Sequence, residues 1–345
     1  MQLDTSASTQ AEKLCPGIEK IVSGNLSDWN WLDSLIVLKD GKAVYESYFH
    51  GEAEDLREVY SSTKSCLSCL IGIALSRGDI PSLDQRLVEI FPNRLPAKLD
   101  ERKKDITLRH CLAMQSGLDY QNTWEFAELF SKTADPVDFF FSDHLPVIAD
   151  PGVVWCYSGA DSQMVSEVLV ACTGRSASEL VREWLFEPLG IDGFRWPRAF
   201  PVEGASEWPA ETGASGLALT TRDFAKLTEC IRQHGRYHDR QIIPKDWLDT
   251  ATTPQPGVDS EFLANFYQSL GLPHISEMLG YGYHFGQANV AGTPNPIIAG
   301  MGGQYGFIFR EMNLSIVQTA NFEGDGLSGG VELAKLISEI AKAHN

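Results

Sequence analysis

The chain is poor in basic residues, with 28 lysines and arginines against 46 aspartates and glutamates in 345 residues, and its formal net charge is −18. An acidic protein is repelled by nucleic acid and by anionic membrane surfaces, so we expect neither nucleic acid nor a membrane as a partner. The sequence also lacks an apolar run of about 18 residues, the length that spans a membrane. Its polar first residues do not resemble a signal sequence, and we therefore expect a cytoplasmic protein.

Cysteine is scarce, and the seven cysteines are an odd number in mostly apolar helical contexts, which favours reduced thiols over a disulfide framework. Cys66 and Cys69 have the spacing of a redox or metal pair, but no second pair exists, so we interpret both as core residues. We expect no metal and no cofactor. H-E-x-x-H and Walker sequences are missing, and His110 and His284 have no recognisable triad partner, which favours structural roles for both. The segment 213–217, GASGL, fails G-x-S-x-G at its last position, which removes the nucleophile elbow of the α/β-hydrolases.

The sequence does contain S-S-T-K at 61–64, directly ahead of a long apolar stretch. Residues at i and i+3 of a helix lie about 5–6 Å apart at Cβ, so Ser61 and Lys64 can touch. The stretch from Cys66 to Leu75 is apolar almost all round, which indicates a buried helix. Burial disfavours the ammonium form of Lys64, so this lysine could act as a base, and the helix N-terminus would stabilise an oxyanion at Ser61. The alternative is an N-cap serine followed by a solvated lysine.

Strand-like segments lie at both ends of the sequence and helical segments in the middle. The Asp40-Gly41 pair predicts a hairpin between strands at 35–38 and 43–45. Helices are expected from 61 onward and at 83–91, 107–114, 136–141, 161–173, 176–186, 223–234, 245–252 and 330–344, and strands at 281–285, 297–299, 306–309 and 314–320. This layout predicts an α+β fold, in which residues 1–64 and 206–345 form one antiparallel sheet flanked by helices. A mostly helical region, 65–205, is inserted, and the active site would lie at the seam.

Two further segments could complete a serine-based site. Tyr157 follows a Pro-Gly turn and precedes a helix, and a phenol beside a lysine can relay a serine's proton because the ammonium favours phenolate. The alternative for Tyr157 is a residue that anchors a loop against the core. The glycine-rich segment Gly300–Gly306 precedes a strand and would let a substrate approach the backbone closely, although it could also be a plain turn. It is not G-x-G-x-x-G, because Tyr305 takes the third glycine's place.

Taken together and in this order, these elements resemble the serine β-lactamase-like superfamily, which includes the penicillin-binding proteins. The resemblance is strongest to its class C-type branch of esterases, D-amino-acid peptidases and 6-aminohexanoate-dimer hydrolases, and it spans roughly residues 32 to 335. The segments that carry it are Leu35–Gly51, Tyr60–Lys64, Ile106–Leu118, Pro151–Ser158, Glu187–Ile191, Ser215–Asp223 and Gly300–Gly306.

The resemblance implies a mechanism. Ser61 would attack a carbonyl carbon, and Lys64 and Tyr157 would share the proton transfers. The backbone N–H groups of Ser61 and Gln304 would bind the oxyanion, and water would release the acyl group from the serine.

The resemblance also implies substrate contacts at Gly303 and Tyr305, and two departures from the family narrow the substrate. Gly159 stands where an asparagine or serine would bond a substrate amide, and Met301 stands where a lysine or histidine would bind the carboxylate of a β-lactam. We therefore expect a serine hydrolase for a small neutral ester or amide, with weak or no β-lactamase activity. The alternatives are an acyltransferase of the same fold and a catalytically inactive scaffold. The sequence does not predict the oligomeric state.

Overall fold

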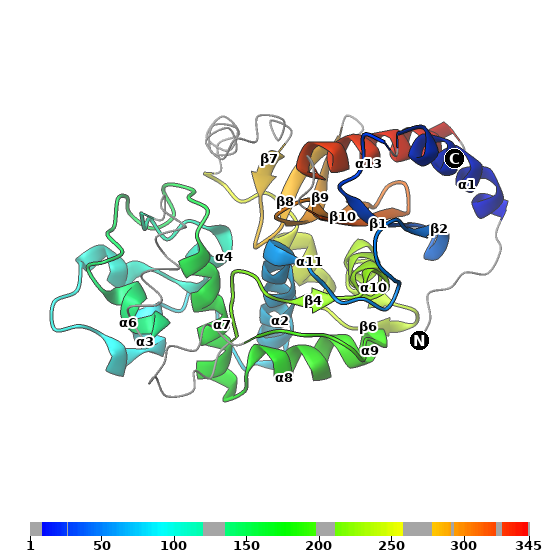
Figure 1. Ribbon diagram of the computed structural model, residues 1–345. Coiled ribbons are helices and arrows are strands. Elements are labelled where there is room, and N and C mark those ends of the chain that lie inside the picture. The colour runs from blue at the N-terminus through cyan, green and yellow to red at the C-terminus, as the bar shows by residue number, and fades with distance from the viewer. Residues whose placement is uncertain are drawn as a thin grey trace.

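The computed structural model describes residues 9–25, 27–119, 135–197, 211–257, 278–290, 293–321 and 326–343. Within this part of the chain a seven-stranded antiparallel sheet runs in the order β2-β1-β11-β10-β9-β8-β7 (Figure 1). Its strands are β1 (Leu32–Lys39), β2 (Lys42–Tyr48), β7 (Met278–Tyr281), β8 (Gly286–Val290), β9 (Thr293–Gly300), β10 (Gln304–Phe309) and β11 (Leu314–Ala320). The two ends of the chain meet where β1 pairs with β11, with Ile36 opposite Val317. The predicted α+β fold with one antiparallel sheet is therefore confirmed.

The predicted hairpin between β1 and β2 forms around Asp40 and Gly41. Both residues have left-handed backbone angles, with φ of 52° and 81°, as the tight turn of a two-residue hairpin requires. The strand predicted at 281–285 is wrong from Gly282 onward, because β7 ends at Tyr281 and a turn follows. A Cβ on Gly282 would lie 2.1 Å from the carbonyl oxygen of Ala251, so this turn packs directly on the neighbouring helix. The alternating aromatic residues imitate a strand there.

Helices cover both faces of the sheet. The helices α1 (Thr9–Asn25) and α13 (Gly326–Ala343) lie together on one face, and α10 (Thr221–Arg232) packs on the other (Figure 1). Strand β10 shows how the sequence divides its side chains between the faces: Phe307 and Phe309 join the apolar cluster under α1 and α13, whereas Ile308 joins the cluster on the α10 side.

The α10 side of the sheet continues into the helical region. Its buried cluster includes Ile36 and Val317 of the sheet together with Leu67 of α2, so one apolar core runs from the sheet into that helix. The remaining elements are α2 (Thr63–Arg77), α3 (Leu87–Ile90), α4 (Leu108–Ala113), α6 (Pro136–Phe141), α7 (Gly159–Thr173), α8 (Ala177–Val181), α9 (Glu187–Leu189), α11 (Lys245–Ala251), the 3₁₀ turns η1 (Tyr60–Ser62), η2 (Pro92–Arg94) and η3 (Glu101–Asp105), the π turn η4 (Arg182–Phe186), and the short strands β3 (Arg57–Glu58), β4 (Ala218–Leu219), β5 (Arg236–Tyr237) and β6 (Arg240–Gln241).

Two predicted helices are shorter or more broken than expected. The helix predicted at 83–91 is reduced to α3, and the one predicted at 176–186 is α8 followed by the π turn η4. The predicted boundary at 205/206 lies outside the described residues, so the division into two regions stays a prediction. None of the helices described is long and apolar enough to cross a membrane.

Candidate active site

Ser61 and Lys64 lie at the entrance to α2. Ser61 is the middle residue of η1, which runs directly into α2, and Tyr60 before it has a left-handed backbone with φ of 45°. The Nζ atom of Lys64 donates a hydrogen bond of 3.0 Å to Ser61 Oγ. Only 3% of Lys64 is exposed, whereas a lysine with no role in a site normally keeps its ammonium group in water. The alternative of an N-cap serine with a solvated lysine is therefore wrong.

A second hydrogen bond fixes the Lys64 ammonium group. Nζ also donates to the backbone carbonyl oxygen of Ala214, at 2.5 Å. Sequence reasoning missed this acceptor, because a backbone carbonyl carries no signature in the side chains.

Tyr157 lies next to Lys64, as the sequence predicted. It precedes α7, whose N-cap Ser158 accepts a hydrogen bond from the backbone N–H of Asp161. The Lys64 Nζ atom lies 4.9 Å from the centre of the Tyr157 ring, within the range of a cation–π contact. The ring packs at 6.3 Å from Trp155 and edge-on at 6.4 Å from Tyr281, so an aromatic cluster orients it.

The turn between β9 and β10 lies against η1. Gly302 and Gly303 have φ of 78° and 98°, which a residue with a side chain rarely adopts. A Cβ on Gly300 would lie 2.2 Å from the carbonyl oxygen of Val59, so only glycine lets η1 approach the end of β9 this closely. The hydroxyl of Ser62 donates to the backbone carbonyl of Gln304 at 3.3 Å, which brings the start of β10 beside the residue that follows Ser61.

The side chain of Gln304 is occupied elsewhere. Its Nε2 donates to the carbonyl of Ala320 at 2.6 Å, and its Oε1 accepts from the N–H of the same residue at 3.1 Å. These two bonds fix β10 to β11 and leave the backbone of Gln304 as the part that can serve the site.

Tyr305 is not brought to the other candidate residues by its side chain. It is 3% exposed and packs 5.1 Å from Phe307, in the apolar cluster under α1 and α13. Lys64 belongs to α2, which packs on the opposite side of the sheet. The alternation of side chains along β10 explains this placement, and we no longer expect the Tyr305 ring to contact a substrate.

His284 lies beneath α2. Its Nδ1 is 3.2 Å from the backbone carbonyl oxygen of Lys64, and the hydroxyl of Ser65 donates to the backbone carbonyl of His284 at 2.7 Å. Complete burial, followed by the nearby Lys64 charge, lowers the pKa of His284 to about 3, so the ring is neutral. Its contacts are to the backbone of the helix, which agrees with the predicted structural role.

The two departures from the family pattern are visible in the structure. Gly159 is the first residue of α7 and offers no side chain to the site. Met301 is 45% exposed at the turn between β9 and β10 and carries no charge. Neither position supplies a group that would pair with a carboxylate.

The cysteines do not form a reactive or ligand site. The described part of the chain includes all seven, and each carries a free thiol. Cys66 and Cys69 are completely buried in α2, and burial raises the pKa of Cys66 to about 12. No group of three or more histidine, cysteine, aspartate or glutamate residues in the described ranges is arranged to hold a metal ion.

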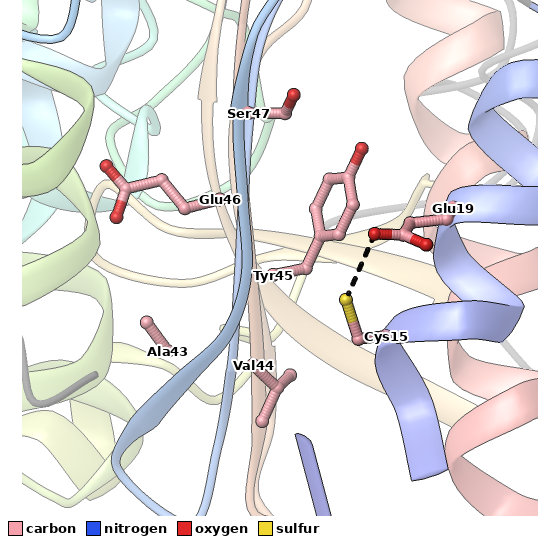
Figure 2. Close-up of a pocket in the computed structure, with 7 residues that line it drawn as sticks. All are labelled: Cys15, Glu19, Ala43, Val44, Tyr45, Glu46 and Ser47. Carbon is pink, nitrogen blue, oxygen red and sulfur yellow. Dashed lines mark hydrogen bonds between the residues drawn. The ribbon is translucent and has the colours of Figure 1, made fainter. Parts of the chain in front are cut away.

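A hollow of about 270 Å³ opens between α1 and the edge strand β2. Figure 2 shows Cys15, Glu19 and Tyr45 on one side of β2 and Glu46 pointing away on the other. The Cys15 thiol donates to Glu19 at 3.5 Å, and burial raises the pKa of both Cys15 and Tyr45. Both groups therefore stay protonated at neutral pH, and we do not assign this hollow to the chemistry at Ser61.

Comparison with known proteins agrees with this geometry. A family model described as Beta-lactamase matches residues 33–336. Esterase EstB of Burkholderia gladioli is 22% identical over 332 residues, which cover 81% of each chain. A D-aminopeptidase of Cereibacter sphaeroides is 29% identical over 173 residues, which are 45% of this chain and only 31% of that relative.

A solved structure shows the same fold. EstCE1, described as a hydrolase with promiscuous acyltransferase activity, superimposes with a TM-score of 0.72 at 17% identity, over 97% of this chain and all of that one. The family match covers most of the sequence, including the Ser61, Tyr157 and Gly300 segments. The chain therefore belongs to the Beta-lactamase family of serine β-lactamase-like hydrolases.

Proposed function

We propose that this chain is a serine hydrolase that acts on a small neutral ester or amide through an acyl-serine intermediate. The observation that carries the proposal is the 3.0 Å hydrogen bond from Lys64 Nζ to Ser61 Oγ, made by a lysine that is almost completely buried. A serine hydroxyl is a weak nucleophile until a neighbouring base takes its proton, and a lysine held this close can provide that base.

The reaction would proceed in two halves. In the first, Ser61 Oγ attacks the carbonyl carbon, its proton passes to the pair formed by Lys64 and Tyr157, and that pair protonates the leaving alcohol or amine. The backbone N–H groups of Ser61 and Gln304 would stabilise the negative oxygen. In the second half, water gives a proton to the same pair and attacks the acyl carbon; the bond to Ser61 Oγ then breaks, the pair returns the proton to Oγ, and the free acid leaves. The contact between Ser62 and the Gln304 carbonyl supports this use of β10.

Met301 is exposed but uncharged, and Gly159 has no side chain, so neither residue could bind a substrate carboxylate. Both therefore support a substrate without a carboxylate next to the reacting bond. A cation at the Met301 position would make a charge-assisted hydrogen bond, and methionine cannot replace it. The names of the relatives, an esterase and a D-aminopeptidase, support an ester or an amide respectively. We expect short-chain p-nitrophenyl esters to be turned over much faster than penicillins or nitrocefin, and efficient nitrocefin hydrolysis would contradict the neutral substrate.

Labelling with a fluorophosphonate probe tests the nucleophile. The native protein should be labelled, and Ser61→Ala should lose the label and at least about a thousandfold of its esterase activity. Ser76→Ala is the matched control, because Ser76 lies near the other end of α2 and only bonds the Ile73 carbonyl. This control should label normally, and both variants should unfold at the native temperature. A native protein that resists labelling would favour the inactive scaffold.

An acyltransferase is the second candidate, because EstCE1 is described as a hydrolase with promiscuous acyltransferase activity. Both reactions share the acyl-serine and differ only in whether water or another nucleophile takes the acyl group. Product analysis with added alcohols or amines separates them. Transfer products that dominate over the free acid would replace hydrolysis by acyl transfer as the main activity.

We also propose that the protein works in the cytoplasm. The free state of all seven cysteines supports a reducing compartment, since a secreted protein with this many thiols usually pairs them. Fractionation of cells that produce the protein tests this location. Recovery of the activity outside the cytoplasmic fraction would contradict it.

A further inference from the structure

The carbonyl that accepts from Lys64 belongs to a short irregular segment, residues 211–217, which we name the acceptor loop. Its C-terminal end is fixed to the first residue of α2, close to Ser61: the N–H of Leu217 donates to Thr63 Oγ1 at 3.2 Å. Ala214 lies between this attachment and the start of the loop. The position of the Ala214 carbonyl therefore also depends on how the first residues of the loop are held.

Gln163 holds those first residues from α7. Its Oε1 accepts a hydrogen bond of 2.8 Å from the N–H of Gly213, and its Nε2 donates to the carbonyl of Glu211 at 3.2 Å. The same Nε2 donates to Glu167 Oε1 at 3.0 Å, so both hydrogens of the amide are used and its orientation is fixed. Gln163 is 4% exposed, so water does not readily replace these bonds.

The acceptor loop lies directly on the backbone of α7. A Cβ on Gly213 would lie 2.2 Å from the carbonyl oxygen of Ser162, so the loop and the helix touch without any side chain between them. Other groups also support the loop, since Ser166 donates to the Glu211 carbonyl at 3.1 Å and Trp196 to the Thr212 carbonyl at 3.0 Å. The bond from Gly213 to Gln163 is the one adjacent to Ala214.

We propose that Gln163 is a positioning residue, which holds Gly213 so that the Ala214 carbonyl accepts from the Lys64 ammonium group. This inference rests on the proposed function, in which Lys64 moves the proton of the nucleophile. Because α7 starts two residues after Tyr157, the helix that carries Gln163 also fixes Tyr157. One helix, α7, thus places both groups that contact Lys64, the Tyr157 ring and the Ala214 carbonyl. The helix therefore also sets the distance between these two groups.

Gln163→Leu tests the proposal, because leucine fills a similar volume and makes none of these three hydrogen bonds. We expect kcat for a p-nitrophenyl ester to fall about tenfold to a hundredfold, as for a reacting group displaced by about 1 Å, with little change in KM. The pH profile of kcat/KM should also change, because Lys64 Nζ loses the Ala214 carbonyl as a hydrogen-bond partner. Ser166→Ala is the matched control from the same helix and should keep the native profile.

A second variant and a structure keep the test independent of folding and of the proposed function. Gly213→Ala pushes the loop away from α7 without altering Gln163, and it should change the pH profile in the same way. In the crystal structure of Gln163→Leu, the Ala214 carbonyl should no longer lie within hydrogen-bond distance of Lys64 Nζ. An unmoved carbonyl, an unchanged pH profile, or an equal change in Ser166→Ala would each overturn the role of Gln163. Failure of the native protein to label at Ser61 would instead refute the proposed function, and the crystal structure would still decide for Gln163.

Discussion

Replacing Asp161 by asparagine should stabilise the protein at pH 8 and above, and the gain should shrink as the pH falls. Asp161 lies in the first turn of α7, four residues after Tyr157, and it is completely buried. Burial raises the pKa of this carboxyl from 3.8 to about 8, although hydrogen bonds from Ser116 and Ser158 act in the opposite direction. The group therefore carries a proton in the native protein at neutral pH.

The size of the effect follows from the difference between the folded and unfolded states. In the unfolded chain the carboxyl loses its proton near pH 3.8, whereas in the native protein it keeps the proton until about pH 8. Between these values the native state binds one more proton, so the free energy of unfolding falls as the pH rises, by about 1.4 kcal/mol per pH unit. Over the whole window the loss is about 4–6 kcal/mol, a large part of the ~5–15 kcal/mol that stabilises a typical protein.

Urea unfolding of the native protein and Asp161→Asn, at each pH from about 5 to 9, measures this difference. Asparagine has no proton to lose in this range, so the two free energies should be closest at low pH and diverge by about 1.4 kcal/mol per unit until about pH 8. Asp239→Asn is the control, because the Asp239 side chain is fully exposed, so the same substitution there should leave the pH dependence of stability unchanged. A gap between the native protein and Asp161→Asn that does not change with pH would refute the reasoning.

Three further predictions concern the surroundings of Ser61. Burial lowers the pKa of His284 to about 3, so its neutral ring contributes stability that is fully present above pH 6.5 and is lost as the pH falls. Between pH 6.5 and 4 the free energy of unfolding of His284→Gln should therefore fall by about 1.4 kcal/mol less per pH unit than that of the native protein. Equal slopes of the two free energies in urea unfolding would contradict this. Gly300→Ala would set a Cβ 2.2 Å from the Val59 carbonyl oxygen and push η1 away from β9, so kcat/KM should fall at least about tenfold. Native activity in this variant would show that the reaction does not depend on the contact between η1 and β9. Met301→Lys should lower KM about tenfold for an ester that carries a carboxylate and leave the KM of a neutral ester unchanged. Equal changes for both esters would show that a cation at position 301 does not bind the carboxylate.

The parts of the structure that the sequence could predict are those set by local patterns. The Asp40-Gly41 turn requires two left-handed residues, and this pair supplies them at low cost, so the hairpin was predictable. The spacing of Ser61 and Lys64 allows a contact as soon as the segment is helical, and the apolar stretch behind them indicates that helix. The pairing of the two chain ends followed from strands at both termini around a helical middle.

The parts that could not be predicted depend on which groups the fold brings together. The face of the sheet that Tyr305 occupies depends on the strand register, and a shift of one residue would reverse it. The turn after Tyr281 has the alternation of a strand, and only the close packing of Gly282 on Ala251 distinguishes it. The Ala214 carbonyl is a backbone group, and any residue at that position would carry it.

The residues of the proposed site are attached to two different parts of the molecule, which we call the two halves of the site. Lys64 and its neighbours are held by α2 and α7, through the Tyr157 contact and the Gln163 bond to the acceptor loop. The Gln304 backbone, which would bind the oxyanion, is fixed to the sheet by two bonds to Ala320. A shift between the sheet and the helices would therefore move the Gln304 N–H away from Ser61 and Lys64, while the contacts within each half stayed intact. The contact of η1 with the end of β9 joins the halves, and it depends on a glycine, because any side chain at position 300 would meet the Val59 carbonyl. We infer that activity depends more steeply on this contact than overall stability does, since the contact sets the distance between the two halves.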